Sequence, residues 1–210
     1  MDTTYVWLLW WVMLFRLRTW TKPWSTLLRY WVGPSETNEQ YRRWIRELVS
    51  MWVTILWIVA DGRKWLLRSF TRFPVQMCQF HMKAIVTRSI GKRPRLDQHR
   101  EFKDMIEMLW RVRRDTFIDW LESRAWRHAD WLSEKNEEWN YKHTKARRAL
   151  RSVRYHLPHL FTHCDYKDMP ATTNSCEWKA AWIKQKANVH RGLIPTRKKK
   201  LIDWYLNWSD

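Results

Sequence analysis

Three acidic residues stand where side chains of this type could hold metal ions. Asp61 directly follows the apolar run 53–60, Asp2 precedes the apolar stretch 5–15, and Glu177 lies near the start of a predicted last helix. Functional residues of α/β sheets gather at the carboxyl ends of strands, where the loops open a crevice. Two carboxylates at neighbouring strand ends can share a pair of divalent cations about 3.5–4 Å apart. Acids at strand tips are common, so spacing alone is weak evidence for such a site.

A Cys-x-x-His pair, Cys78 and His81, follows the next short apolar run, 74–77. Two ligands do not make a structural zinc site, which normally needs four. Cys164, His163 and Cys176 could supply the partners. We expect instead a structural role, in which both side chains sit at a strand end and pack or hydrogen-bond near the crevice, so zinc is not an expected cofactor.

The charge balance indicates a polyanionic partner. The 210 residues include 39 Lys and Arg against 21 Asp and Glu, a formal net charge of +18. Such an excess favours nucleic acid over a membrane surface, because the charge would otherwise only repel itself. The alternative is a soluble protein whose basic surface is merely solvated. The length suits one domain, or one domain with an insertion.

Cysteine usage and hydropathy indicate a cytoplasmic protein. Three cysteines without regular spacing argue against a disulfide scaffold and for a reducing compartment. The apolar stretch 5–15 is too short to span a bilayer, which takes about 20 residues. It also follows an acidic residue, which is unlike a signal peptide. We therefore expect no membrane partner.

The apolar pattern predicts the element order β-β-α-β-α-β. Residues 5–18 and 25–32 read as a hairpin, and residues 37–51 as an amphipathic helix with Tyr41, Ile45 and Leu48 on one face. The continuous apolar run 53–60 is typical of a buried parallel strand. Residues 63–70 then predict a short helix and residues 74–80 a further strand.

The rest of the chain reads as helical. From Leu96 to about Leu157 the sequence is charged and offers no strand candidate, with helical periodicity over 104–121 and 142–156. We expect Pro158 to break the pattern. A last helix is predicted over about 174–189, ended by Gly192 and Pro195.

Four short motifs in order resemble one family. They are Met-Asp-Thr-Thr-Tyr (1–5), Asp61-Gly62, Gln-Met-Cys-Gln-Phe-His (76–81) and Thr-Thr-Asn-Ser-Cys-Glu (172–177). The set is similar to the core of bacterial insertion-sequence DDE transposases of the Mutator-like group, which carries Cys-x-x-His after its second Asp. The closing residues 184–193 also match that pattern, so the resemblance covers nearly the whole chain.

The resemblance implies an α/β fold: an RNase H-like mixed sheet flanked by helices, with an all-helical insertion between the second Asp and the Glu. We accordingly expect residues 1–87 to form the first part of the core and 88–168 the insertion. Residues 169–195 would complete the core with the catalytic helix, and 196–210 would be a basic C-terminal tail. In the family the first catalytic Asp ends the first strand, but here it is residue 2. We therefore expect an N-terminally truncated fragment of doubtful activity.

The resemblance also implies the chemistry of DNA transposition and recombination: hydrolysis of DNA phosphodiesters followed by strand transfer. Asp2, Asp61 and Glu177 would hold two Mg²⁺ (or Mn²⁺) ions, since an all-oxygen site suits Mg²⁺. The expected partners are the DNA of the transposon ends and target, met at the nucleoid, and further copies of the chain in a homo-oligomer. Residues expected to contact DNA beside the site are Asn174, Lys184, Lys186, His190 and Arg191.

Tryptophan is unusually abundant, with 19 Trp beside only 4 Gly. Trp52 falls between a predicted helix and strand, and Trp20 in the predicted hairpin turn, both places that favour glycine. Similar family sequences tend to carry glycine at positions 7, 11, 65 and 178. We hypothesise that many of these tryptophans are glycines encoded by UGA and translated with the wrong table. The alternatives are a genuinely Trp-rich or decaying gene, in which Trp packs in the core or stacks on unpaired bases.

Two other function classes compete with the transposase. One is a non-catalytic, basic nucleic-acid-binding protein or decayed transposase relic, which the charge alone would explain. The other is a cationic membrane-surface protein, which depends only on residues 5–15.

Overall fold

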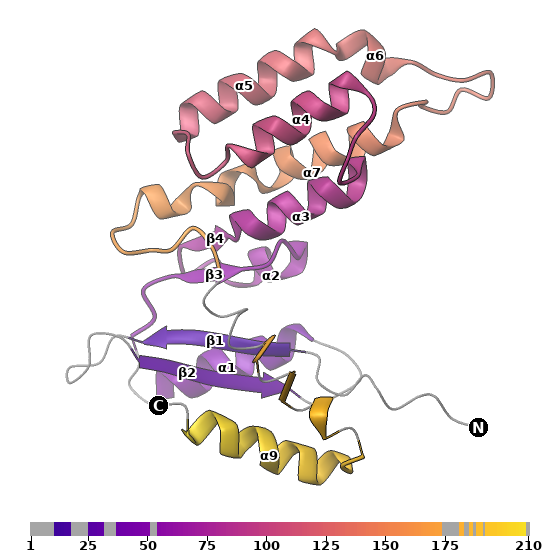
Figure 1. Ribbon diagram of the computed structural model, residues 1–210. Coiled ribbons are helices and arrows are strands. Elements are labelled where there is room, and N and C mark those ends of the chain that lie inside the picture. Colours follow the sequence, from indigo (N-terminus) through magenta and orange to yellow (C-terminus); the bar gives the residue numbers. More distant parts are fainter. Residues whose placement is uncertain are drawn as a thin grey trace. The chain divides into compact units, whose positions relative to one another are not determined.

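The computed structural model describes residues 54–173 continuously, residues 37–50, and residues 181–208 with gaps at 183–184, 187 and 191; for residues 11–17 and 25–31 it describes the backbone. The chain divides into two compact units, which are described separately. The terminal unit comprises residues 1–56 and 174–210, and the central unit comprises residues 57–173. Figure 1 labels the elements of both.

The terminal unit contains the predicted hairpin strands and the amphipathic helix. Strands β1 (Trp11–Leu17) and β2 (Ser25–Trp31) pair antiparallel, from Trp11 opposite Trp31 to Leu17 opposite Ser25. Helix α1 (Asn38–Ser50) buries Tyr41, Trp44 and Leu48. Trp44 is buried in place of the expected Ile45, which is only partly buried, although both positions fit the 3.6-residue helical repeat.

Residues 195–208 differ from the prediction. Pro195 was expected to end a helix and 196–210 to form a tail, but helix α9 (Pro195–Trp208) begins at this proline. Proline is well suited to the first helical position, where its missing N–H costs nothing. Ile202 is buried on α9, and the ring of Tyr205 lies edge-on to Trp182 at 5.3 Å. The region expected to form a tail therefore contains a helix, and Ile202 gives this helix a buried side chain.

The central unit is an α/β arrangement with a small parallel sheet. Strands β3 (Ile58–Ala60) and β4 (Val75–Met77) pair in parallel, with Ala60 opposite Met77. Helix α2 (Lys64–Ser69) connects them, as predicted. The strand expected over 53–60 is shorter than the apolar run: residues 54–57 are not in a strand and Leu56 is half exposed. Pairing stops because Pro74, which precedes β4, has no N–H to donate.

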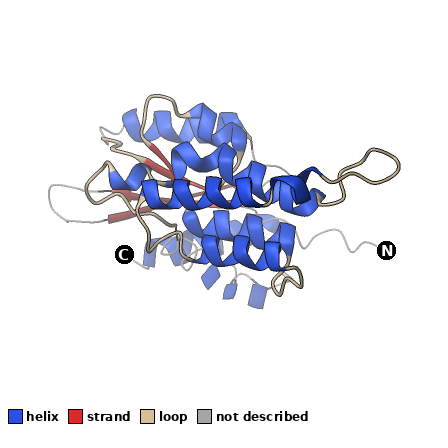
Figure 2. Cartoon of the chain, turned by 90° about the horizontal axis from the view of Figure 1, so that it is seen from above, coloured by secondary structure: helices blue, strands red, loops and turns tan. Residues whose placement is uncertain are grey.

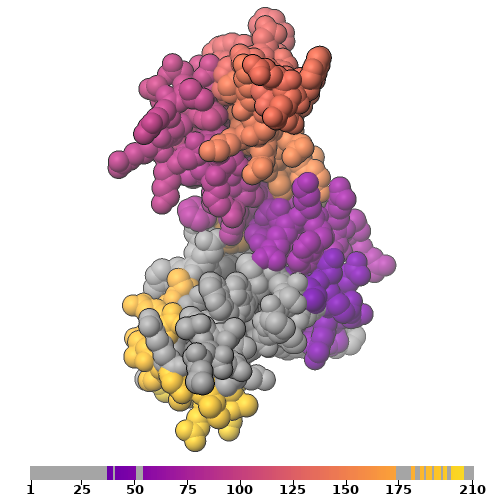
Figure 3. Space-filling model, turned by 90° about the vertical axis from the view of Figure 1, so that its right-hand side faces the viewer, coloured from indigo at the N-terminus to yellow at the C-terminus, as the bar shows by residue number. Residues whose placement is uncertain are grey.

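Helices make up the rest of the central unit, and Figure 1 shows α3, α7, α4 and α5 stacked on one side of the β3–β4 pair. Their bounds are α3 Gln79–Ile90, α4 Asp97–Glu107, α5 Arg114–Arg127, α6 Ala129–Ser133 and α7 Thr144–Leu160, followed by the 3-10 turn η1 Thr162–Cys164. Apolar side chains fill the stack, with the rings of Phe117 and Phe161 5.5 Å apart. The α3–α4 and α6–α7 regions lie side by side on one face in Figure 3.

Three details of the helical prediction are wrong. Residues 104–121 are not one helix, because i→i−3 bonds from Met108 and Leu109 tighten and end α4. Pro158 lies inside α7, which ends only two residues later, so the lost hydrogen bond affects one turn. Gln79 and Phe80 begin α3 and do not continue β4, since Met82 N–H already donates to the Cys78 carbonyl at 3.1 Å.

The loop between α6 and α7 extends away from the helices in Figures 1 and 2. The two arms of this loop meet at an isolated β-bridge between Lys135 and Tyr141. The turn between them is closed by the Asn136 carbonyl, which accepts from Trp139 N–H at 3.0 Å. Trp139 has φ 59°, in the left-handed region, and its side chain is 77% exposed. A bulky residue in this conformation is an outlier at a position that favours glycine.

Candidate functional site

Asp61 lies at the carboxyl end of β3, as predicted. Its side chain is 22% exposed and pairs with Arg63, whose Nε donates to Oδ2 at 3.1 Å. The Arg63 backbone N–H also approaches Oδ1 at 3.3 Å. The carboxylate is thus held by its own loop but keeps one side open to another ligand.

Gly62, the next residue, is enclosed by two elements. A Cβ atom at this position would lie 2.4 Å from Cε and 2.8 Å from Sδ of Met77, a side chain with no exposed surface. The Gly62 carbonyl accepts a hydrogen bond from Nε2 of His156 on α7 at 2.8 Å. The loop that carries Asp61 is therefore fixed by β4 on one side and by the helical stack on the other.

Cys78 lies between β4 and α3, fully buried, and its sulfur is surrounded by donors. The backbone N–H and the hydroxyl of Thr173 donate to Sγ at 3.4 and 3.3 Å. Burial raises the pKa of the Cys78 thiol, but hydrogen bonds from His81 and Thr173 outweigh this effect and leave the pKa below its ordinary value. The expected packing role near the strand end fits Cys78, whereas His81 lies in the first turn of α3.

Two buried glutamines flank Cys78 and were not identified from the sequence. Gln76 Nε2 donates to the Leu160 carbonyl at 2.8 Å and its Oε1 accepts from His163 N–H at 2.9 Å. Gln79 Nε2 also donates to the Leu160 carbonyl, at 3.0 Å. Both belong to the motif 76–81, so polar residues inside an apolar strand were the available signal. Gln76 attaches β4, and Gln79 the start of α3, to the end of α7.

His163 and Cys164 form a second polar group beside Gln76. His163 Nδ1 lies 3.2 Å from Gln76 Oε1, and its Nε2 lies 3.6 Å from the exposed Cys164 sulfur. Burial and the nearby Arg114 lower the pKa of His163, and Asp165 partly offsets them. A neutral ring that donates from Nδ1 presents Nε2 as an acceptor to the thiol.

The described side chains offer little for a metal ion. Within the described ranges, no group of three or more His, Cys, Asp or Glu residues is arranged to hold a metal ion. Asp61 supplies one oxygen ligand of the expected three, and its partly open carboxylate is the kind that Mg²⁺ takes. Arg63 would have to release an oxygen for this to happen.

Most of the other predicted site residues lie outside the described part of the chain: Asp2, Asn174, Cys176, Glu177, Lys184 and Arg191. Of the predicted DNA contacts, Lys186 is described with its Nζ 5.8 Å from the centre of the Trp182 ring, and His190 is exposed. The structure therefore brings Asp61, Cys78 and His81 to one region of the central unit and leaves the meeting of Asp61 with Asp2 and Glu177 as a prediction.

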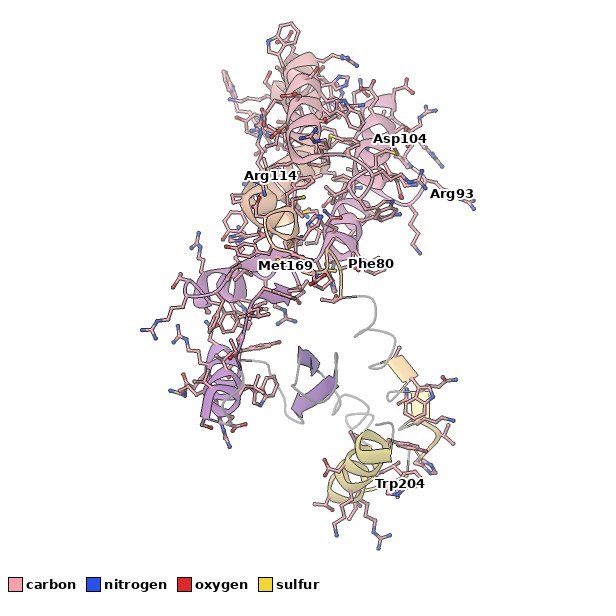
Figure 4. All side chains as sticks on the ribbon, turned by 90° about the vertical axis from the view of Figure 1, so that its left-hand side faces the viewer. Phe80, Arg93, Asp104, Arg114, Met169 and Trp204 are labelled. Carbon is pink, nitrogen blue, oxygen red and sulfur yellow. The ribbon has the colours of Figure 1, made fainter. Side chains whose placement is uncertain are left out.

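A basic face of α7 was not singled out from the sequence. Lys145, Arg148 and Arg151 are exposed at intervals of three residues, and no ion pair to a described residue is formed by any of them. Arg154 continues the face but is neutralised by Glu122, with Nε to Oε1 at 3.0 Å. Arg93, in the exposed loop between α3 and α4, projects away from the helices in Figure 4. These charges could hold a polyanion.

Comparison of this chain with protein-family models, with curated proteins and with solved structures gives no match. No helix in the described part of the chain combines the length and apolar character that crossing a bilayer requires.

Proposed function

We propose that this chain is the catalytic domain of a Mutator-like DDE transposase that cuts and joins DNA. The proposal includes the RNase H-like fold and the assignment of Asp2, Asp61 and Glu177 as the catalytic carboxylates. The observation that carries it is the position of Asp61 at the carboxyl end of a parallel strand pair, beside Cys78 at the end of the neighbouring strand. A helical block then separates Asp61 from Glu177 in the sequence, as the resemblance implies.

The three carboxylates would hold two Mg²⁺ or Mn²⁺ ions. When bound, such a pair activates an attacking hydroxyl and stabilises the leaving oxygen of a phosphodiester. The protein's own contribution at Asp61 is to fix the carboxylate. Arg63 holds both of its oxygens, and Gly62 is locked through Met77 and His156. A ligand fixed before the ion arrives costs less ordering on binding.

DNA would be held by its phosphates. The exposed row Lys145, Arg148 and Arg151 forms no ion pair with a described residue, and Lys186, His190 and the other predicted contacts would add further charge. Contacts of this kind set position and orientation without reading sequence. Two DNA ends and a target are most simply joined by more than one copy of the chain, so a homo-oligomer is part of the proposal.

The test is metal-dependent cleavage of DNA carrying the element's ends, with Asp61→Asn and Glu177→Gln compared against Asp104→Asn. Asp104 is an exposed acid on α4 that forms no ion pair with a described residue, and so serves as the matched control. The proposal predicts that the first two variants lose cleavage and keep DNA binding, while Asp104→Asn retains both. Equal activity in Asp61→Asn and the parent would refute it.

The second candidate is a non-catalytic nucleic-acid-binding protein, favoured by the unpaired basic row on α7. It predicts salt-sensitive DNA binding that none of the acid substitutions impairs, and no metal-dependent cleavage by a parent protein that binds DNA ends.

A further inference from the structure

Two positive side chains of α2 gather over one aromatic ring of α7. Lys64 and Arg68 are exposed, and Nζ of Lys64 and Cζ of Arg68 lie 4.6 and 5.6 Å from the centre of the Tyr155 ring. Neither forms an ion pair with a described residue. Like charges four residues apart on a helix repel each other, so an anion bound between them would be stabilised.

The acid nearest to this pair in the sequence is already occupied. Asp61 accepts from Arg63, whose Nε lies 3.1 Å from Oδ2 and whose backbone N–H lies 3.3 Å from Oδ1. The positive charges of Lys64 and Arg68 therefore remain available to an anion from outside the chain.

The ring beneath these charges is tied to the Asp61 loop. Tyr155 lies edge-on to His156, with the ring centres 5.0 Å apart, and Nε2 of His156 lies 2.8 Å from the Gly62 carbonyl oxygen. Lys64 also follows Asp61 by only three residues, which limits their Cα separation to about 11 Å. The two cations and the proposed metal ligand thus belong to one fixed region of the central unit.

The basic face of α7 leads to the same region. Four side chains recur at intervals of three or four residues and so share one stripe of this helix: Lys145, Arg148, Arg151 and Tyr155. The helix rises about 15 Å over these ten steps. One strand of duplex DNA has a phosphate about every 3.4 Å along its axis, so the stripe spans about four of them.

We propose that Lys64 and Arg68, held over Tyr155, form a phosphate-binding subsite that guides the DNA backbone from the basic face of α7 to the Asp61 loop. This inference deepens the proposed function and rests on it for the identity of the polyanion. The planar guanidinium of Arg68 matches two oxygens of one phosphate, and the Lys64 ammonium adds a compact charge. Such contacts align the duplex without reading its sequence.

Lysine acetylation followed by mass spectrometry measures whether DNA covers Lys64. In the full chain, saturating duplex DNA should slow acetylation of Lys64 about fivefold or more, because the ammonium is then paired with a phosphate. The control is Lys103 on α4, which is partly exposed and donates to the Lys92 carbonyl at 2.8 Å, and which should keep its rate. An unchanged rate at Lys64, or equal slowing of both lysines, would overturn the subsite.

Substitution tests the same contacts through affinity. The double variant Lys64→Ala/Arg68→Ala should bind duplex DNA about tenfold more weakly at 0.1 M salt and lower the slope of log affinity against log salt by about one. The matched control is Arg154→Ala, which also removes one cation but one that Glu122 already neutralises. A parental salt slope in the double variant would contradict the proposal.

The outcomes separate this inference from the proposed function. A parent whose Lys64 is protected by DNA but which has no metal-dependent cleavage would overturn the proposed function alone. Cleavage that Asp61→Asn abolishes, together with an unprotected Lys64, would overturn the subsite alone. Equal protection by inorganic phosphate at the same total phosphate concentration would indicate a site for a free anion and overturn the assignment to DNA.

Discussion

His156 on α7 hydrogen-bonds the carbonyl of Gly62, with Nε2 2.8 Å from the oxygen, and so joins the helical stack to the residue beside Asp61. Its other ring nitrogen, Nδ1, lies 2.7 Å from the Ser152 carbonyl, and the side chain is almost completely buried. The two partners are 94 positions apart along the chain. The loop that carries the proposed metal ligand therefore depends on a helix far along the chain.

Replacing His156 by Leu should lower the free energy of unfolding by about 1–3 kcal/mol, because the half-buried Gly62 carbonyl loses this donor. His156→Gln places an amide N–H near the position of Nε2 and should recover part of the loss. Denaturant unfolding followed by circular dichroism measures both. Equal losses for the Leu and Gln variants would show that the hydrogen bond to Gly62 contributes nothing.

Trp139→Gly should raise the free energy of unfolding by about 1 kcal/mol. A non-glycine residue in the left-handed region costs about 1–2 kcal/mol, and the loss of the ring contact to Lys135, 4.6 Å from the ring centre, offsets part of the gain. The matched control is Trp126→Gly, an equally exposed Trp within α5, where glycine should destabilise by about 1 kcal/mol. Destabilisation by both substitutions would contradict a glycine preference at 139.

Acidification should destabilise the central unit through His163. Its pKa lies below the ordinary value because burial and Arg114 oppose protonation, so below about pH 6.5 the unfolded chain binds a proton more readily than the folded one. The stabilising contribution is complete above that pH and is lost as pH falls through the folded pKa. His163→Gln, measured against the parent from pH 8 to 5, should show a shallower loss of stability. Parallel profiles of unfolding free energy against pH for His163→Gln and the parent would contradict this role of His163.

The basic face of α7 should contribute to DNA affinity. Arg148→Ala and Arg151→Ala should each weaken binding to any duplex and reduce the slope of log affinity against log salt by about one. Arg154→Ala is the control, because Glu122 already neutralises this guanidinium; its salt slope should stay close to the parent's. DNA-binding titrations at several salt concentrations measure these slopes. Unchanged slopes in all three variants would exclude this face of α7 from the DNA interface.

Local patterns predicted the elements of the central unit better than their ends. The apolar run before Asp61 predicted strand β3, and the short apolar run before Cys78 predicted strand β4. The two strands pair in parallel. The break between α4 and α5 has no Gly or Pro to announce it, since it depends on i→i−3 bonds at Met108 and Leu109. Pro158 was misleading because the helix tolerates it near its end.

The polar contacts of the site depend on tertiary packing, and the sequence alone could not supply them. Cys78 and His81 were identified as a pair, but Thr173, whose hydroxyl donates to the Cys78 sulfur, is 95 residues away along the chain. The sequence also did not predict which tryptophan has a glycine-like backbone. Trp20 and Trp52 lie outside the described residues, and Trp65 is helical, whereas Trp139, which the sequence did not single out, has the glycine-like backbone.

The most direct test of the central claim is to map the metal site with Fe²⁺ in place of Mg²⁺. Bound iron with ascorbate generates radicals that cut the nearest peptide bonds, and mass spectrometry locates the cuts. The account predicts cuts beside Asp61 and near residues 2 and 177, suppressed by excess Mg²⁺ and absent from Asp61→Asn but present in Asp104→Asn. Cuts that avoid residue 61, or that persist unchanged in Asp61→Asn, would contradict the assignment of Asp61 as a metal ligand.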